Sequence, residues 1–402
     1  MNDAIPAEPD LAPQAPAARH PGRPLRLGLI GAGTISQSIH LPALRRLRPE
    51  IELVAVCDAS PSRADSIARH EGVQSEHDAS RLIARDDLDA LLLATPGGHG
   101  QLTRAALLAG RHVFAEKPLT LTRADARELG ALAAERGLVL QVGYMKMYDP
   151  LIAETRAQLE GLEPRLVRIT VLHPADAAQT GHLRIGPLLD DSDPATIGSA
   201  RAYDEALTTA ALGANSGPLG TWYRDVLHGS VIHELSLLRA LGLGLPDCFD
   251  YVRLWPWPLA GEPPCLLAGA RLPGGAQLLL SWNWLPDHPE YSEEVAIFAR
   301  EGRVRLDMAP PYLIDARSTL YVERAAGELR TATQLTRGRD SGFVAQLAAF
   351  AASVREGAPV LSDAAGAAAD TGCLQRVAVA AAAALGGPAL GGETALGGET
   401  AS

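Results

Sequence analysis

The sequence predicts an α/β protein in which an N-terminal Rossmann domain, with a doubly wound parallel sheet, precedes an α+β domain with an open, mostly antiparallel sheet. Three observations support this fold class. A Gly-x-Gly turn follows the first apolar run. From there to about Tyr148, short apolar runs alternate with segments whose apolar residues recur at helical spacing, which is typical of parallel βα units. Beyond Phe249 the apolar runs follow one another across short turns, which favours antiparallel pairing.

The composition limits the classes of protein to which this chain can belong. It has 402 residues, a formal net charge of −11 and 47% hydrophobic residues. The negative charge argues against a nucleic-acid partner, and no apolar run reaches the length of a transmembrane helix, which argues against a membrane partner. Four cysteines without paired or metal-ligand spacing indicate reduced thiols in a cytoplasmic protein that holds no metal.

These patterns divide the chain into four parts. Residues 1–24 are rich in Ala and Pro, and residues 386–402 are repetitive, so both are predicted to be disordered tails. Residues 25–148 form the predicted Rossmann domain. Residues 149–385 form the predicted second domain.

A nucleotide-binding turn follows the first strand. The apolar run ending at Ile30 leads into Gly31-Ala32-Gly33, and a helix is expected directly afterwards. Gly31 permits a tight turn, Gly33 lets the backbone approach a pyrophosphate, and amides at the start of the helix face the phosphate charge. Ser36 stands where the usual fingerprint has a third glycine.

The second apolar run ends at Asp58, at the spacing expected for the acid of a dinucleotide site. A carboxylate there can hydrogen-bond the adenosine ribose and would repel a 2′-phosphate, which favours NAD over NADP. Arg63, a few residues further on, keeps NADP possible, although an ordinary helix-face arginine is the more common reading.

The segment Arg111–Ala115 reads as a buried strand, and Glu116-Lys117-Pro118 follows it. A lysine at the carboxyl end of a parallel strand lies at the edge where such sheets bind ligands. Pro118 cannot extend the strand ladder, so the chain turns there, and the bond before it is a candidate for the cis form. Alone, Lys117 would read as a surface residue, but the upstream turn favours a functional site.

The remaining elements follow in chain order. In the first domain the expected helices are Ser36–Leu47, Pro61–Arg69, Gly100–Ala109 and Arg123–Arg136. The second domain is expected to begin with the helix Leu151–Leu159, the strand Leu166–Leu172, a loop-rich stretch from His173 to Thr221 and the helix Tyr223–Leu241. Its expected strands are Phe249–Trp255, Cys265–Leu272, Ala276–Trp284, Glu293–Ala299 and Val304–Leu306, before two helices at Gly342–Arg355 and Ala364–Ala384.

Two features of the second domain suggest further roles. A structureless loop as long as 173–221 is uncommon and typically functional, and its Asp190-Asp191-Ser192-Asp193 run could recognise an amino group, although a solvated acidic turn is the more common reading. Tryptophans at positions 255, 257, 282 and 284 gather on the sheet. They are core residues, or they cover a face that binds a second subunit.

In this order, the motifs resemble those of the glucose-fructose oxidoreductase, inositol dehydrogenase and MocA family, which are NAD(P)-dependent sugar oxidoreductases. The resemblance runs from about Leu25 to Leu385. It is carried by Gly31-Ala32-Gly33, His40-Leu41-Pro42-Ala43-Leu44, Asp58, Thr95-Pro96, the stretch from Ala109 to Pro118, the stretch from Gly143 to Pro150, and the stretch from Glu301 to Leu306.

The resemblance implies a fold, a cofactor and a set of site residues. It implies NAD, with NADP possible, and a substrate-binding second domain whose open sheet joins a homodimer or homotetramer. It implies cofactor contacts from Gly31, Gly33, Thr34, Ile35, Asp58, Arg63, Thr95, Pro96, His99, Glu116 and Lys117. It implies substrate contacts from Lys117, Tyr144, Lys146, His228 and His233.

The implied reaction transfers hydride between nicotinamide and a secondary hydroxyl or keto group of a sugar, cyclitol, sugar nucleotide or aminosugar derivative. Lys117 would touch the reacting oxygen and His233 would be the general base. The chemistry suits them, because a near-neutral histidine can take a hydroxyl proton while an ammonium stabilises the oxyanion.

The helix that carries His233 departs from the family pattern. The family often has an aspartate four residues earlier and a carboxylate three residues later, where this chain has Gly229 and Ser236. Glu234 is expected to point elsewhere on the helix, and Asp225 to lie two turns away, too far for direct contact.

Two further departures affect the neighbouring loops. The Thr95-Pro96 loop is about one residue shorter than usual, so His99 matches the family's loop histidine only approximately. Lys146-Met147 replaces a frequent arginine pair. Two alternatives therefore stay open: a non-catalytic protein that binds NAD and a sugar, and a reductase of a non-sugar C=O, C=N or C=C substrate.

Overall fold

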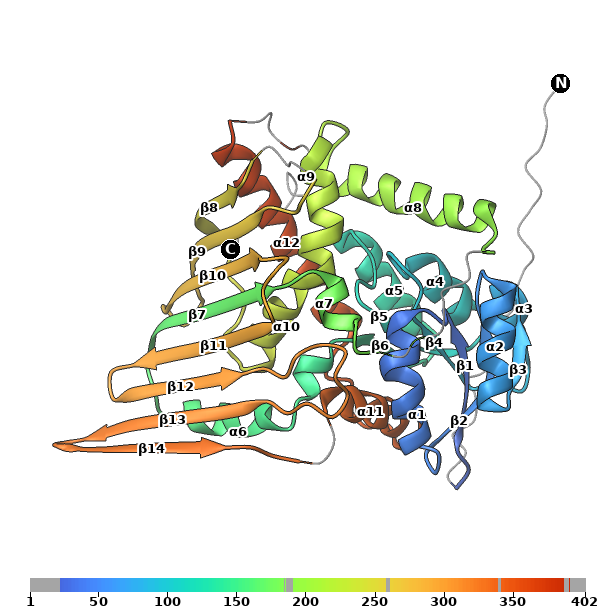
Figure 1. The fold of residues 1–402 in the computed structure, drawn as a ribbon, viewed down its shortest axis with the longest axis horizontal. Helices are drawn as coiled ribbons and strands as arrows, with labels where there is room; N and C mark the ends of the chain where they lie inside the picture. The colour runs from blue at the N-terminus through green and yellow to red at the C-terminus, as the bar shows by residue number, and fades with distance from the viewer. Residues whose placement is uncertain are drawn as a thin grey trace.

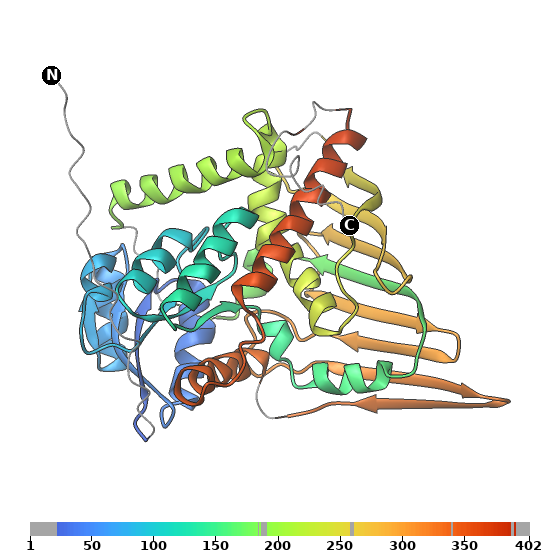
Figure 2. The ribbon, with the colours of Figure 1, turned by 180° about the vertical axis from the view of Figure 1, so that it is seen from behind.

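The computed structural model describes residues 22–183, 185, 191–257, 261–338, 341–386 and 390. The two predicted tails lie almost wholly outside this part of the chain. Figure 1 and Figure 2 show two sheets side by side, with the Rossmann domain at one end of the molecule and the larger sheet at the other. In the described ranges, no helix is both long and apolar enough to cross a membrane.

The first sheet is parallel, with the strand order β3-β2-β1-β4-β5-β6 that is typical of Rossmann domains. Its strands are β1 Leu25–Ile30, β2 Ile51–Cys57, β3 Gln74–Glu76, β4 Ala90–Leu93, β5 His112–Glu116 and β6 Leu140–Gly143. Its helical segments are η1 Ser36–His40, α1 Leu41–Arg46, α2 Pro61–Glu71, α3 Ala79–Ile83, α4 Gly100–Leu108 and α5 Arg123–Glu135. The sequence patterns missed β3 and α3, because β3 has only polar residues and both elements are short.

The second sheet has the order β14-β13-β12-β11-β7-β10-β9-β8, and only the β7–β10 pair is parallel. Its strands are β7 Pro164–His173, β8 Phe249–Trp255, β9 Cys265–Arg271, β10 Gln277–Trp284, β11 Ser292–Ala299, β12 Gly302–Asp307, β13 Thr319–Ala326 and β14 Leu329–Leu335. Helices α6 Leu151–Leu159 and α12 Ala364–Ala384 pack on one face (Figure 2). The prediction of an open, mostly antiparallel sheet is confirmed.

The prediction of a loop-rich stretch from residue 173 to residue 221 is wrong. The described residues of this stretch form the helices α7 Asp176–Thr180, α8 Pro194–Leu212 and α9 Gly217–Trp222. Helix α8 has few large apolar side chains, so it lacks the hydrophobic periodicity that predicts a helix. The sequence does contain a typical helix start, an aspartate followed by a proline. In the structure, Asp193 accepts hydrogen bonds from two amides of the first turn, and Pro194 is the first helical residue.

Helix α8 reaches from the second domain over the Rossmann domain (Figure 1). It is followed by α9, the π-helix η3 Tyr223–Val231 and α10 Ile232–Ala240. The short helix η2 Met145–Tyr148 joins the two domains, and α11 Gly342–Glu356 contacts it.

The C-terminal part of the chain also completes the core of the Rossmann domain. Phe350 of α11 packs edge-on against Phe114 of β5, with ring centroids 5.8 Å apart, and Phe114 packs in the same way against His40. All three side chains are fully buried. The two domains are therefore held at one relative position near the end of β5, where Glu116 and Lys117 follow.

Candidate active site

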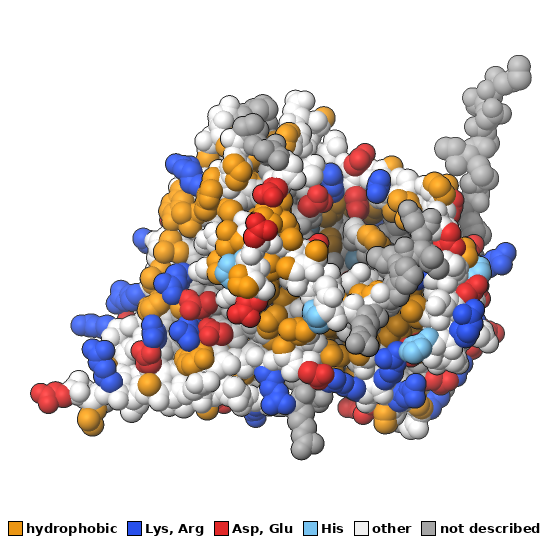
Figure 3. Space-filling view, viewed as in Figure 1, with side chains coloured by type: hydrophobic (Ala, Val, Ile, Leu, Met, Phe, Trp, Pro, Cys, Tyr) orange, Lys and Arg blue, Asp and Glu red, His pale blue; other side chains and the backbone are white. Residues whose placement is uncertain are grey.

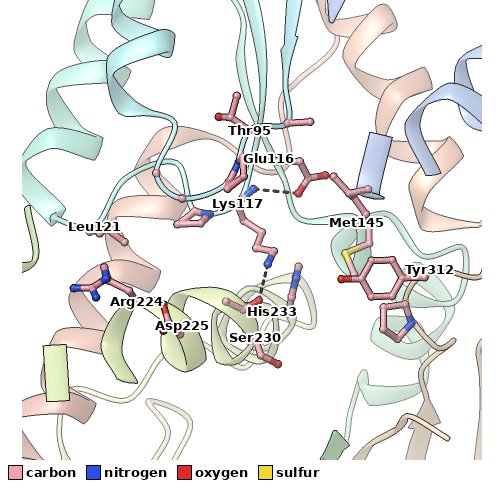
Figure 4. A pocket seen from close by; sticks show the side chains of 18 of the residues that line it. Thr95, Glu116, Lys117, Leu121, Met145, Arg224, Asp225, Ser230, His233 and Tyr312 are labelled. Carbon is pink, nitrogen blue, oxygen red and sulfur yellow. Dashed lines mark hydrogen bonds between the residues drawn. The ribbon is translucent and has the colours of Figure 1, made fainter. Parts of the chain in front are cut away.

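A cavity of about 690 Å³ lies at the carboxyl end of the Rossmann sheet, facing the second domain. Its wall comes from the loop after β4, the end of β5, η2, the end of β7, α8, and the helix formed by η3 and α10. Figure 4 shows the Lys117 side chain pointing from the end of β5 toward the helix that carries Asp225, Ser230 and His233. Open α/β sheets bind their ligands at this edge.

The glycine turn after β1 has room for a phosphate group. Gly31 has φ +96°, and a Cβ there would lie 2.6 Å from the Ala94 carbonyl carbon, so only glycine fits. A Cβ on Gly33 would meet no atom within 4 Å, which leaves open space in front of the turn. The Ser36 hydroxyl donates to the Gly31 carbonyl at 2.5 Å. The turn therefore fits the pyrophosphate of a dinucleotide.

Asp58 is held beside this turn. Its Oδ2 accepts a hydrogen bond from the Ala32 amide at 2.7 Å, and its Oδ1 accepts from the Ser60 amide at 2.8 Å and from Arg63 Nη1 at 3.1 Å. The carboxylate is thus fixed next to the glycine turn, where an adenosine ribose would lie. Arg63, the residue that kept NADP possible, is paired with Asp58.

Glu116 is the last residue of β5 and is almost fully buried. His40 Nε2 lies 3.0 Å from its Oε1, and the Lys117 amide donates to its Oε2 at 3.2 Å. Burial disfavours the charged carboxylate, but the hydrogen bond from His40 and the nearby Lys117 outweigh it, so the pKa of Glu116 lies below its ordinary value. A Cβ on Gly143 would lie 2.9 Å from the Glu116 carboxyl carbon, so that glycine makes room for this group.

Lys117 bridges the two domains. The Lys117–Pro118 peptide bond is cis, and the ammonium group donates to the carbonyl oxygen of Gly229 in η3 at 2.5 Å (Figure 4). Burial lowers the pKa of Lys117, against the attraction of Glu116.

His233 lies across the cavity from the end of β5 (Figure 4). Its Nδ1 is buried without a hydrogen-bond partner among the described residues, and its ring packs edge-on against Tyr144 at 6.5 Å. Burial, together with the cations Lys146 and Lys117, lowers the pKa of His233 well below its usual 6.5. A neutral imidazole can accept a proton.

The π-helix also brings Asp225 to this cavity. Asp225, Gly229 and His233 follow one another at intervals of four residues along the helix formed by η3 and α10, a spacing that keeps them near one face. Asp225, Gly229 and His233 therefore line the same cavity. As expected, no hydrogen bond joins Asp225 to His233 in the described part of the chain, although both line the cavity. Burial raises the pKa of the Asp225 carboxyl.

We expect the His233 imidazole to stay neutral as the pH falls through 6.5, the ordinary histidine midpoint, because burial and the two lysines lower its pKa. Proton NMR of the imidazole resonances measures this, with His233→Asn identifying the signal by its loss. A His233 midpoint at or above 6.5 would contradict the assignment of a neutral base.

A buried ion cluster lies behind one wall of the cavity. The Lys146 ammonium contacts Glu234 Oε1 at 2.9 Å and Glu293 Oε2, and the Tyr291 hydroxyl donates to Glu293 Oε2 at 2.7 Å. Burial, with repulsion from Glu293, raises the pKa of Glu234 to about 7. The two carboxylates outweigh burial and raise the pKa of Lys146. Glu234, expected to point away from His233, contacts Lys146.

The predicted site residues divide into two groups. Those on the cavity wall are Ile35, Thr95, Pro96, Glu116, Lys117, Lys146 and His233. Gly31, Gly33, Thr34, Asp58 and Arg63 belong to the adjacent turn and the end of β2. Tyr144, His99 and His228 do not line the cavity.

These last three side chains have partners inside the protein. His99 Nδ1 lies 2.9 Å from the Pro118 carbonyl oxygen, and His228 Nδ1 lies 3.1 Å from that of Tyr223. Burial lowers the pKa of His228 to about 4. Tyr144 is fully buried behind His233. The predicted cofactor contact of His99 and substrate contacts of Tyr144 and His228 thus find no support in the geometry of the cavity.

Sequence reasoning missed an aromatic group on the second-domain side. His173, at the end of β7, lines the cavity and stacks on Trp284 with centroids 5.5 Å apart, while Tyr291 meets it edge-on at 5.7 Å. Trp282 donates to Ser230 Oγ at 2.9 Å, so this tryptophan points toward η3 and not toward a partner subunit. The parallel pairing of β7 with β10 brings these residues together, and no local sequence signal predicts it.

The fold and the turn together define a two-domain protein with a Rossmann dinucleotide site facing a second, sheet-based domain. Residues 25–144 match the model of an oxidoreductase family with an NAD-binding Rossmann fold, the GFO/IDH/MocA family.

Curated relatives align with about a third of the chain. A dTDP-3,4-didehydro-2,6-dideoxy-alpha-D-glucose 3-reductase from Streptomyces antibioticus is 40% identical over 129 residues, which is 32% of this chain and 39% of the relative. Inositol 2-dehydrogenase 4 from Saccharopolyspora erythraea is 40% identical over 140 residues, 34% of this chain and 41% of the relative. The chain thus spans about two fifths of the length of the curated relatives it matches.

Solved structures resemble almost the whole chain. A 3-ketoreductase from Actinomadura kijaniata in complex with TDP-benzene and NADP aligns with a TM-score of 0.66 at 22% identity, covering 89% of this chain and 98% of its own. UDP-N-acetylglucosamine 3-dehydrogenase from Acidithiobacillus ferrooxidans aligns with a TM-score of 0.64 at 21% identity, with the same coverage. At these identities the likeness shows the shared two-domain fold.

Proposed function

We propose that this protein is an NAD(P)-dependent oxidoreductase that interconverts a secondary hydroxyl and a keto group on a sugar, cyclitol, sugar nucleotide or aminosugar derivative. The observation that carries the proposal is the convergence of Lys117 and His233 on one cavity beside a dinucleotide turn. The names of the relatives, which include sugar-nucleotide reductases and inositol dehydrogenases, agree with it.

Each residue has a distinct role in this proposal. The bound nicotinamide would supply or accept the hydride. His233, neutral through burial, would take the hydroxyl proton during oxidation and return it during reduction. Lys117 would hold the substrate oxygen and stabilise its developing negative charge. Glu116, anchored by His40, would fix the direction of Lys117.

The test is a substrate panel. Purified protein with NAD or NADP and a set of sugars, cyclitols and nucleotide sugars is expected to form reduced nicotinamide, followed by absorbance, with at least one of them. Product mass spectrometry with deuteride-labelled cofactor then locates the transferred hydride. Label on a carbon derived from a C=C or C=N bond would point to the non-sugar reductase instead.

A non-catalytic role has one observation in its favour. His233 Nδ1 has no hydrogen-bond partner among the described residues, so nothing in them orients the imidazole as the family's same-helix carboxylates would. Tight dinucleotide binding without turnover across the whole panel would favour a regulatory, sugar-sensing protein.

We also propose residence in the cytoplasm and assembly into a homodimer or homotetramer through the uncovered face of the second sheet. Figure 3 shows hydrophobic side chains interspersed with charged ones over this sheet, and Trp255 of β8 and Leu329 of β14 are exposed. A monomer in light scattering would contradict the assembly.

A further inference from the structure

A segment of the second domain docks onto the cofactor half of the Rossmann domain just ahead of α8. Asp191 Oδ1 accepts a hydrogen bond from the Ser60 hydroxyl, and its Oδ2 accepts from the Ser62 amide at 3.1 Å. Two residues later, the Asp193 amide donates to the Ala59 carbonyl at 3.2 Å. Asp191 and Asp193 therefore meet the end of β2, and neither lines the cavity that holds Lys117, while Asp190 lies outside the described residues.

Asp191 and Asp58 lie on two sides of the same residue. The Ser60 amide donates to Asp58 Oδ1 at 2.8 Å, while the Ser60 hydroxyl donates to Asp191. Ser60 is also the N-cap of α2, an eleven-residue helix. The start of a helix favours a negative charge, because its amides are unpaired and its dipole is positive there. The Asp191 carboxylate supplies this negative charge at the start of α2.

A dinucleotide in this site would place its ribose at Asp58, because a Rossmann domain holds the ribose hydroxyls with the acid that ends the second strand. A 2′-phosphate on that ribose would project toward the start of α2. The hydroxyl of Ser60 and the amide of Ser62, which could bind it there, already donate to Asp191. A phosphate would therefore meet occupied donors and two carboxylates.

The position of Asp191 is held by the helix that follows it. Further along α8, both carboxylate oxygens of Asp204 accept from the Gly98 amide at 3.2 Å, in the loop after β4. A Cβ on Gly97 would lie 2.2 Å from Asp204 Oδ2, so glycine permits this approach. Tyr203 donates to Asp125 at 3.2 Å. Because α8 contacts the Rossmann domain at its N-cap and again near its middle, the Asp191 carboxylate is held at Ser60.

We propose that Asp191 is a specificity residue for the cofactor, and that its carboxylate takes the place of the 2′-phosphate of NADP and makes the site selective for NAD. The proposal rests on the proposed function only in requiring that the site bind a dinucleotide. The same fold accepts NADP in the A. kijaniata 3-ketoreductase, so the selectivity has to come from individual side chains.

The test measures dinucleotide binding directly, by calorimetry or by the fluorescence of reduced nicotinamide, and needs no substrate. The wild-type protein is expected to bind NADH at least about 30-fold tighter than NADPH. Asp191→Asn is expected to lower the ratio of NADH affinity to NADPH affinity about tenfold. The change should come from tighter NADPH binding, with NADH affinity unchanged. A tenfold change corresponds to removing about 1.4 kcal/mol of repulsion.

Asp193→Asn is the matched control, because it removes the same charge two residues away while asparagine can still cap α8. The ratio of NADH to NADPH affinity of this control variant is expected to equal that of the wild type. The inference would be overturned if the wild-type protein bound both nucleotides equally. It would also be overturned if Asp191→Asn had the same ratio of NADH to NADPH affinity as the wild type. If neither nucleotide binds to any variant, the proposed function itself fails, and the inference with it.

Discussion

Replacing Lys117 with alanine is expected to lower kcat about a thousandfold while NADH affinity changes by less than about threefold. The ammonium group sits at the carboxyl end of β5, bound to the Gly229 carbonyl and facing the cavity that His233 lines. Removing it takes away the cation that would stabilise charge on the reacting oxygen. It leaves the glycine turn and Asp58 intact, so the dinucleotide should still bind.

Added ethylammonium provides the control for this variant. Alanine leaves a space in the shape of the missing side chain, and a small amine that enters it is expected to restore part of the rate. Methylated quaternary amines of similar size, which have no N–H donor, should not. Activity of Lys117→Ala within about tenfold of the wild type would contradict the assigned role.

Replacing Lys146 with methionine is expected to destabilise the fold by about 3–5 kcal/mol. The variant would leave Glu234 and Glu293 buried without their cation, and neither side chain reaches solvent. The measurement is urea unfolding followed by tryptophan fluorescence. Trp282 and Trp284 are suitable reporters, because the His173 ring contacts both of them and also contacts Tyr291, a member of the cluster.

The triple variant Lys146→Met, Glu234→Gln, Glu293→Gln separates charge from packing. Neutral amides no longer need a buried cation, so this variant is expected to recover more than half of the loss. An unfolding midpoint for Lys146→Met equal to that of the wild type would show that the cluster is not a buried ion pair. A triple variant no more stable than the single one would assign the loss to packing.

The parts of the fold that local patterns predicted are those that bury apolar residues against the core. The helices Leu151–Leu159 and Ala364–Ala384 and the strand Phe249–Trp255 have the bounds that the sequence predicts. The exposed helix α8 and the polar strand β3 have no such pattern, because neither buries a continuous apolar face.

The site shows the same division. The turn at Gly31, the acid at Asp58 and the lysine at the end of β5 depend on local geometry: a positive φ, a strand end and a proline. The partners of Lys146 do not, because Glu234 and Glu293 come from a helix and a strand that only the packed second domain brings together.

The sequence by itself determined that this protein has a dinucleotide turn, a parallel sheet and a lysine at the ligand edge, because these depend on residues close together in the chain. Only the tertiary structure decided which charges meet. It placed Asp191 at Ser60, 131 positions apart in the chain, and Lys146 between two glutamates. Contacts at such separations depend on how helices and strands pack, and no spacing in the sequence encodes that.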